Sequence, residues 1–164
     1  MHKMTAEEYN ICVAKHSDNV YRFILKSIRD DEKAKDIVQD SYEKMWLKIK
    51  EVSFEKSKSY LFSIAYHTMI DQIRRDKRVG TMDEVKQSTF SHSEQYSDLN
   101  EHIHRAVEQL PEIQKNVLLL RDYEGYSYEE IGEITGLNES QVKVYIYRAR
   151  LFLKSYIGSL EAVI

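Results

Sequence analysis

Proline and glycine, the residues that most often interrupt regular secondary structure, are scarce in this sequence. It contains one Pro and five Gly among 164 residues. Strand-and-turn folds usually contain more of both, so the composition favours a soluble protein rich in helix. Long hydrophobic runs are also missing, since nowhere do about 18 apolar residues follow one another, and no cationic segment followed by an apolar run opens the chain. We therefore expect a cytoplasmic protein.

Residue types that bind metals or perform covalent chemistry form no familiar pattern. Cys12 is the only cysteine, so no disulfide can form within the chain. The closest of the six His, His102 and His104, are two residues apart and would lie on different sides of a helix. There is no glycine-rich phosphate-binding loop and no pair of nucleophile and base. The sequence thus predicts no metal, no cofactor and no enzymatic activity.

An excess of positive charge, which would point to nucleic acid, is absent from the chain as a whole, whose net charge is −3. The balance changes along the chain, however. Residues 1–78 hold 16 Lys and Arg against 13 Asp and Glu, residues 79–100 hold 1 against 4, and residues 101–164 hold 7 against 10. Attraction to phosphates depends on where the cations lie, so the net charge excludes little.

Two capping signals in the last third of the chain indicate a helix-turn-helix. Ser127 can cap a first helix, with Glu130 three residues later as its reciprocal partner. Gly136 supplies a left-handed residue at which that helix can stop. Asn138 and Gln141 repeat the capping device for a second helix. Two capped helices separated by so short a turn are typical of this motif.

The second of these helices has two different faces. Its apolar residues, at spacings that keep one stripe against a core, are Val142, Ile146, Ala149 and Leu153. The face that would meet base edges and phosphates in a major groove consists of Ser140, Lys143, Val144, Tyr147, Arg148 and Arg150. Residues 141–154 hold four cations and no acid, whereas residues 122–139 hold six acids and no cation. The alternative is a solvated basic helix in an ordinary bundle.

An acidic row lies along one face of the helix that is expected to begin at Asp30 or Asp31 and to run to Val52. The row and its flanking residues are Asp36, Gln39, Asp40, Glu43 and Trp46. Like charges at helical spacing repel, so a row retained at that cost suggests a basic partner, and an exposed Trp46 would anchor such an interface. In the alternative interpretation Trp46 belongs to the core and nearby lysines neutralise the row: Lys35, Lys44 and Lys48.

A third long helix, expected over residues 58–78 after a short polar loop, combines polar, cationic and aromatic side chains. Its polar row and cationic end consist of Ser63, His67, Asp71, Arg74, Arg75, Lys77 and Arg78. Tyr60, Phe62 and Tyr66 are interleaved, and bases of single-stranded nucleic acid can stack on such rings while the cations follow the backbone. Alternatively, two of these aromatics belong to the core and the cations complement the helix dipole.

The remaining segments complete an all-α architecture of two small helical domains. A capping box at Thr5 and Glu8 starts the first helix, which Ser17 and Asp18 could interrupt. The N-terminal domain is expected to cover residues 1–78.

A flexible linker is expected next, because residues 79–100 are rich in Ser and show no sustained period. The C-terminal domain, residues 101–164, then contains a helix that stops before Pro111 and another that runs to Gly125. These two helices would support the helix-turn-helix.

Three segments, in this order, resemble an extracytoplasmic-function sigma factor of bacterial RNA polymerase. The family's polymerase-docking helix is similar to DEKAKDIVQDSYEKMW, and its minus-10 helix is similar to SYLFSIAYHTMIDQIRRDKR. Its minus-35 domain is similar to residues 110–153. The resemblance covers nearly the whole chain. It implies a sigma subunit that binds core RNA polymerase, recognises minus-35 and minus-10 elements and promotes initiation, while the polymerase performs the chemistry.

The resemblance also implies a role for each surface. The residues that dock on the clamp coiled coil of the largest polymerase subunit would be Asp36, Gln39, Asp40, Glu43 and Trp46. The loop 52–58 would capture a flipped base. The minus-10 residues would be Lys56, Lys58, Tyr60, Ser63, His67, Asp71, Arg74 and Arg75. The minus-35 residues would be Ser140, Lys143, Val144, Tyr147, Arg148 and Arg150. Further partners would be the flap of the second polymerase subunit and an anti-sigma factor, with no membrane insertion.

Four positions depart from the family's pattern. Family members commonly have Trp at Tyr60, Asn at His67, a small polar residue at Val144 and Arg at Tyr145. The promoter sequence therefore cannot be inferred. The competing interpretation is a helix-turn-helix repressor or activator, which would need a dimerisation or effector module. The N-terminal half offers an acidic row in place of an obvious module of that kind.

Overall fold

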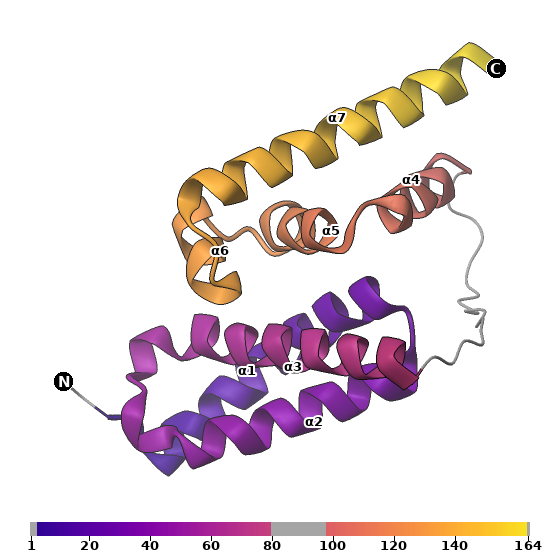
Figure 1. Ribbon diagram of the computed structural model, residues 1–164. Coiled ribbons are helices and arrows are strands. Elements are labelled where there is room, and N and C mark those ends of the chain that lie inside the picture. The colour runs from indigo at the N-terminus through magenta and orange to yellow at the C-terminus, as the bar shows by residue number, and fades with distance from the viewer. Residues whose placement is uncertain (1–2, 80–97, 164) are drawn as a thin grey trace. The chain divides into compact units, whose positions relative to one another are not determined.

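The computed structural model describes residues 3–79 and 98–163, and every regular element in these two stretches is helical (Figure 1). The chain splits into two compact units, one that contains the helices of residues 6–79 and one that contains most of the helices of residues 98–163. The predicted all-α fold with two helical parts and a helix-turn-helix in the second is confirmed. Most of the predicted linker, residues 80–97, lies outside the described residues.

The N-terminal unit is a three-helix bundle. Helices α1 (Ala6–Ile28), α2 (Asp31–Leu47) and α3 (Ser57–Val79) all contact one another. Its large buried side chains, each exposed by 2% or less, are Val20, Phe23, Ile24, Ile37, Met45, Leu61, Phe62 and Met69. Full burial of one such side chain stabilises the fold by roughly 1.5 to 3 kcal/mol. The apolar spacing along each helix thus determines which faces turn away from solvent.

Side-chain caps fix the starts of the first two helices. Thr5 Oγ1 accepts the Glu8 amide at 3.1 Å, and Glu8 Oε1 accepts the Thr5 amide at 3.0 Å, as predicted. Asp30 Oδ1 accepts the Lys33 amide at 3.1 Å. The hydroxyl of Tyr21 donates to the Asp31 carboxylate, and this bond raises the pKa of Tyr21 to about 12. The contact joins α1 to the first turn of α2.

The start of α2 at Asp31 was predicted, but the end of α1 carried no sequence signal. Arg29 ends α1 in the left-handed region, with φ 58°, and its amide donates to the Leu25 carbonyl at 2.7 Å. Glycine or asparagine is the usual residue at such a position, so the turn could not be placed from residue type.

Two predictions about the N-terminal unit were wrong in detail. The first helix is not interrupted at Ser17 and Asp18, since α1 is continuous from Ala6 to Ile28, and Val20 beyond these two residues is buried. Helix α2 ends at Leu47 and does not reach Val52.

The predicted polar loop is more ordered than its composition suggested. The 3-10 turn η1 (Ile49–Glu51) replaces the end of the predicted second helix, and the loop itself holds a second 3-10 turn, η2 (Phe54–Lys56), before α3 starts at Ser57. Val52 is buried and its carbonyl accepts the Met4 amide at 3.0 Å. The loop is therefore anchored to the N-terminal segment.

The second described stretch, residues 98–163, contains α4 (Asp98–Gln109), α5 (Glu112–Leu118), a π-helical turn η3 (Leu119–Tyr123), α6 (Tyr128–Thr135) and α7 (Glu139–Val163). Helices α4 and α5 pack against α7. One cluster of their apolar side chains consists of Val107, Leu110, Leu118, Ala149, Ile103, Phe152 and Leu153. Helix α4 begins at Asp98, so the last residues of the segment predicted as linker are helical.

The helix predicted to run from Pro111 to Gly125 contains a change of geometry. After Leu118 the chain forms the π-helical turn, in which the Glu124 amide donates to the Leu119 carbonyl at 3.1 Å. Gly125 then adopts φ 77°, as expected where a helix stops. Single π turns often occur at functional positions, and this one carries Asp122, which contacts α7.

Candidate nucleic-acid interface

The predicted helix-turn-helix forms between two reciprocal caps. Ser127 Oγ accepts the Glu130 amide at 3.1 Å, and Glu130 Oε1 accepts the Ser127 amide at 2.9 Å. Asn138 Oδ1 accepts the Gln141 amide at 2.8 Å, and Gln141 Oε1 accepts the Asn138 amide at 3.0 Å. Each cap satisfies amides that the first helical turn would otherwise leave without acceptors.

The turn between α6 and α7 depends on two glycines. Gly136 adopts φ 86°, a region that side chains with a Cβ rarely occupy. A Cβ added at Gly132 would lie 2.8 Å from the Leu137 carbonyl oxygen, so the turn packs directly against α6. The second glycine was not singled out from the sequence, because only the folded turn shows the close approach.

Helix α7 separates a buried stripe from an exposed face. Val142, Ile146 and Ala149 are at most 1% exposed, and Leu153 is half-buried, as the spacing predicted. The predicted minus-35 residues are all exposed: Ser140, Lys143, Val144, Tyr147, Arg148 and Arg150. Tyr147 is 64% exposed and Val144 43%. Large exposed side chains opposite a buried stripe give this helix a surface that can enter a groove.

Some cations of this face have partners within the chain. Lys143 Nζ lies 3.5 Å from a Glu139 carboxylate oxygen and 5.7 Å from the centre of the Tyr128 ring, which Arg121 also covers at 4.5 Å. Arg150 donates to Asp122 at 2.7 Å. Arg148, by contrast, forms no ion pair with any residue that the structure describes.

The predicted minus-10 residues lie along α3 and the turn before it. Lys56, His67, Asp71, Arg74 and Arg75 are exposed, whereas Lys58, Tyr60 and Ser63 are half-buried. The Nδ1 atom of His67 is 2.9 Å from the Ser63 carbonyl oxygen, and its ring meets the Tyr66 ring edge to face at 5.1 Å. Phe62 and Tyr66 are core residues, which leaves Tyr60 as the aromatic of this group available for stacking.

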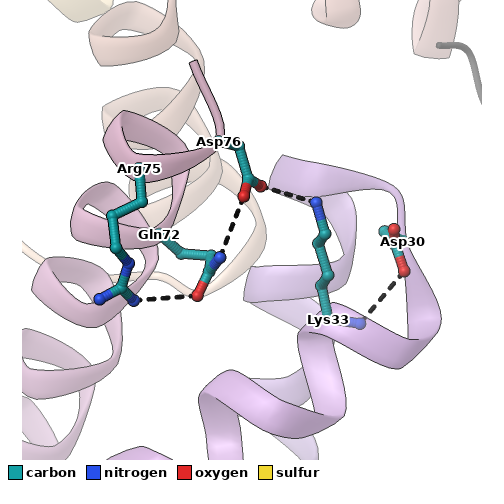
Figure 2. Close-up of polar contacts among 5 residues, drawn as sticks. All are labelled: Asp30, Lys33, Gln72, Arg75 and Asp76. Carbon is teal, nitrogen blue, oxygen red and sulfur yellow. Dashed lines mark hydrogen bonds and ion pairs between the residues drawn. The ribbon is translucent and has the colours of Figure 1, made fainter. Parts of the chain in front are cut away.

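A polar network joins the end of α3 to the start of α2 (Figure 2). Lys33 Nζ lies 2.6 Å from Asp76 Oδ2. Gln72 donates to the other carboxylate oxygen at 3.1 Å and accepts from Arg75 at 3.0 Å. The hydrogen bond from Lys33 is the main reason why the pKa of Asp76 is lowered.

The acidic row of α2 is exposed and is not neutralised within its own unit. Asp36, Asp40 and Glu43 have no ion-pair partner among the described residues. The three lysines that could have neutralised them are engaged elsewhere. Lys35 pairs with Asp31, Lys48 pairs with Glu51, and Lys44 donates to Thr68 at 2.9 Å. The structure therefore rules out the alternative interpretation, in which these lysines neutralise the acidic row.

An aromatic hollow adjoins the acidic row. Trp46 is 47% exposed and meets the Tyr9 ring edge to face at 5.0 Å. Tyr9 in turn donates to the Tyr42 carbonyl at 2.8 Å. The open hollow has a volume of about 470 Å³ and is lined by Tyr9, Gln39, Tyr42, Glu43, Trp46 and Leu47. Trp46 is thus a surface residue, contrary to the alternative that placed it in the core.

Sequence reasoning missed the residues that act across helices. Tyr9 and Tyr42 belong to the hollow, and Lys33 and Asp76 to the polar network, and each of these pairs joins two different helices. Only an acid among four cations at the end of α3 could have drawn attention to Asp76.

The described residues contain no group of three or more His, Cys, Asp or Glu arranged to hold a metal ion. Within the same residues no helix is both long enough and apolar enough to cross a bilayer.

Two family models match the chain, one for each unit. Residues 12–79 match Sigma-70 region 2, and residues 100–153 match Sigma-70, region 4. Together these matches include α2 and α3 on one side and the helix-turn-helix on the other.

Individual relatives match over most of their length. RNA polymerase sigma factor SigV of Bacillus subtilis (strain 168) is 32% identical over 139 residues, which cover 84% of this chain and 84% of that protein. ECF RNA polymerase sigma factor SigM of the same strain is 27% identical over 145 residues, covering 85% of this chain and 89% of that protein. In a solved complex with the anti-sigma factor NepR from Bartonella quintana, the sigma factor RpoE matches with a TM-score of 0.79 and 25% identity. That match covers 93% of this chain and 98% of RpoE.

Proposed function

The chain belongs to the extracytoplasmic-function sigma factors of RNA polymerase, and from this membership we propose how its surfaces divide the work of promoter recognition. As a sigma factor it binds core RNA polymerase, recognises minus-35 and minus-10 promoter elements and promotes the initiation of transcription. The N-terminal domain, residues 1–78, docks on the polymerase and reads the minus-10 element. The C-terminal domain, residues 101–164, reads the minus-35 element.

The acidic row of α2 carries the docking assignment. Asp36, Asp40 and Glu43 share one exposed face without internal counterions, so a basic partner surface would gain attraction without first breaking ion pairs. Trp46 and the hollow beside it add a rigid aromatic anchor, the kind of residue that dominates binding energy in protein interfaces. The proposed partner is the clamp coiled coil of the largest polymerase subunit.

The exposed face of α3 supports the minus-10 assignment. Bases must leave the stack before a protein can read them in single-stranded form, and this costs a few kcal/mol per base. Tyr60 offers a ring surface two residues after the anchored loop 52–58, and His67 offers another further along α3, while Arg74 and Arg75 offer charge for the backbone. The loop captures the extruded base in this proposal.

Helix α7 supports the minus-35 assignment. Its cap at Asn138 fixes its N-terminal turn, and the exposed residues of its next turns can contact base edges in a major groove. Arg148 and Arg150 flank that face and are assigned to phosphates.

The remaining parts of the proposal concern location and regulation. The chain acts in the cytoplasm and performs no covalent chemistry itself. The sigma factor RpoE, whose fold it shares, was solved with the anti-sigma factor NepR, and CnrH, which also shares the fold, was solved with the cytosolic domain of CnrY. By analogy we assign an anti-sigma factor as a partner that competes for the same surfaces.

Fluorescence anisotropy on a promoter fragment, with and without core RNA polymerase, tests the proposal. A sigma factor of this kind should bind the fragment specifically once core enzyme is present and only weakly without it. A helix-turn-helix repressor should bind its duplex alone, as a dimer. Specific binding by the free chain that core enzyme does not change would contradict the proposed division of work.

A further inference from the structure

The C-terminal end of α3 contains four cations and one acid. Arg74, Arg75, Lys77 and Arg78 are exposed, and Asp76 lies among them. A carboxylate is unfavourable there for two reasons. It opposes the helix dipole, which favours cations at this end, and it would repel the phosphates that the cations attract.

Asp76 has no ion-pair partner on its own helix, although the adjacent Arg75 attracts it. An ion pair within a helix needs a cation three or four residues away, but these positions are occupied by Gln72, Ile73, Val79 and Gly80. The cation comes instead from α2, where Lys33 Nζ lies 2.6 Å from Asp76 Oδ2 (Figure 2). The Asp30 side chain fixes the backbone of Lys33 by accepting its amide at 3.1 Å. Lys33 is therefore held at the first turn of α2, facing the end of α3.

The second oxygen of the same carboxylate orients an arginine. Asp76 Oδ1 accepts from Gln72 Nε2 at 3.1 Å, and Gln72 Oε1 accepts from Arg75 Nη2 at 3.0 Å. Arg75 keeps its other N–H groups for an external acceptor, because a guanidinium has five and this bond uses one. A chain of three contacts thus leads from Lys33 on α2 to a proposed phosphate-binding residue on α3.

We propose that Lys33 is a positioning residue of the minus-10 surface, which neutralises Asp76 and thereby lets that carboxylate orient Gln72 and Arg75 without repelling the DNA backbone. Lys33 acts through Asp76 and does not touch DNA. The inference rests on the proposed function of α3. It also explains why an acid is tolerated among the cations of this helix end.

A double-mutant cycle in reconstituted holoenzyme tests this inference. The readout is anisotropy of a labelled promoter fragment with an unpaired minus-10 region, measured at several salt concentrations. Lys33→Met leaves an unscreened carboxylate and should weaken binding by about fivefold, which corresponds to the upper value for an exposed ion pair. Asp76→Asn alone should change binding by less than about twofold, since its amide oxygen still accepts from Gln72.

The decisive variant combines both changes. Lys33→Met with Asp76→Asn should bind within about twofold of the wild type, because no unscreened charge remains. Lys33→Arg, which keeps a cation opposite Asp76, should bind the fragment like the wild type. Lys35→Met is the matched control, since it removes a cation from the same end of α2 that pairs with Asp31. Its effect should simply add to that of Asp76→Asn.

Other results would overturn the inference. If Lys33→Met weakens binding equally in the Asp76→Asn background and lowers the salt slope by about one, Lys33 contacts a phosphate itself. If the variant loses helix content or affinity for core enzyme and Asp76→Asn does not restore them, Lys33 is only a structural residue. A wild-type holoenzyme that fails to bind the fragment would instead refute the proposed function of α3.

Discussion

Asp122, in the π-helical turn η3, accepts a hydrogen bond of 2.7 Å from the guanidinium of Arg150 on α7. The bond joins the helix that supports the motif to the helix proposed to enter the groove. This hydrogen bond also raises the pKa of the Arg150 guanidinium above its ordinary value. Both side chains remain 40% or more exposed, so a phosphate can reach Arg150 but must compete with the carboxylate.

Replacement of this internal competitor should strengthen minus-35 binding. Asp122→Asn keeps the shape of the side chain and removes its charge, so we expect a gain of about twofold to fivefold in affinity of the holoenzyme for a minus-35 duplex. Anisotropy titrations at two salt concentrations measure it. Glu129→Gln, an exposed change of equal charge on α6, is the control. Weaker binding by the Asp122 variant alone would show that the ion pair holds Arg150 in its binding position.

Reversal of charge in the acidic row should abolish polymerase docking. Asp40→Lys places a cation in the middle of a face proposed to meet a basic surface, where like charges cost several kcal/mol. Assembly is measured by size-exclusion chromatography with core enzyme and by a pull-down in which the sigma chain is in excess. Glu7→Lys, on the exposed first turn of α1, is the matched reversal and should leave assembly unchanged. Normal assembly by the Asp40 variant, with helix content preserved, would refute the docking face.

Loss of the cap at Asn138 should loosen the start of α7. Its side chain accepts the Gln141 amide at 2.8 Å, and replacement of such a cap by Ala typically costs about 1 kcal/mol. Asn138→Ala should therefore accelerate hydrogen exchange in the first turn of α7 by roughly fivefold, while α3 exchanges at its former rate. Asn138→Asp, which retains an acceptor, should stay near the wild type. Equal protection in the Ala variant would mean that packing alone fixes this helix start.

Interactions between residues close together in the sequence could be predicted, whereas interactions between distant residues could not. The reciprocal caps at Ser127 and Asn138 and the buried stripe of α7 were predicted correctly, because both depend on residues within four positions of one another. The exposure of Trp46 was left open, since periodicity places a side chain on a face without showing what covers that face.

Interactions between helices could not be predicted in the same way. Lys33 and Asp76 are 43 positions apart, and the contact depends on how α2 and α3 pack. The left-handed Arg29 and the π-helical turn also lacked a signal, because neither has the glycine or proline that usually marks such a change. The exposed rows on α2 and α7 could thus be outlined from the sequence, and their roles as binding surfaces stay predictions, while the residues that orient side chains across helices appeared only in three dimensions.

Acid should weaken the contact between α2 and α3. The Lys33 hydrogen bond lowers the pKa of Asp76, so the carboxylate stabilises the folded state above the ordinary Asp pKa of about 3.9. That contribution disappears as the pH falls through the lower folded pKa. Because the pair is exposed, we expect a loss of less than about 1 kcal/mol. Urea unfolding of the wild type and Asp76→Asn between neutral and acid pH measures it. A constant difference across that range would contradict the prediction.

Val144 should recognise thymine through its methyl group. The side chain is 43% exposed on the proposed minus-35 face of α7, and it has no hydrogen-bonding group with which to read a base edge. Its available means of discrimination is apolar contact, and the C5-methyl group of thymine is the apolar feature of the major groove.

Replacing the contacted thymine by deoxyuridine removes only that methyl group. Holoenzyme affinity should then fall by about threefold to fourfold, the value of one buried methyl group. The Val144→Ala variant should bind both duplexes with nearly equal affinity, because it lacks the contact. Scanning deoxyuridine through every thymine of the minus-35 element locates the contacted position. Val142→Ala is not a suitable control, because Val142 is buried. Equal loss in the wild type and in Val144→Ala would assign the methyl contact to another residue of the face, with Tyr147 as the next to test.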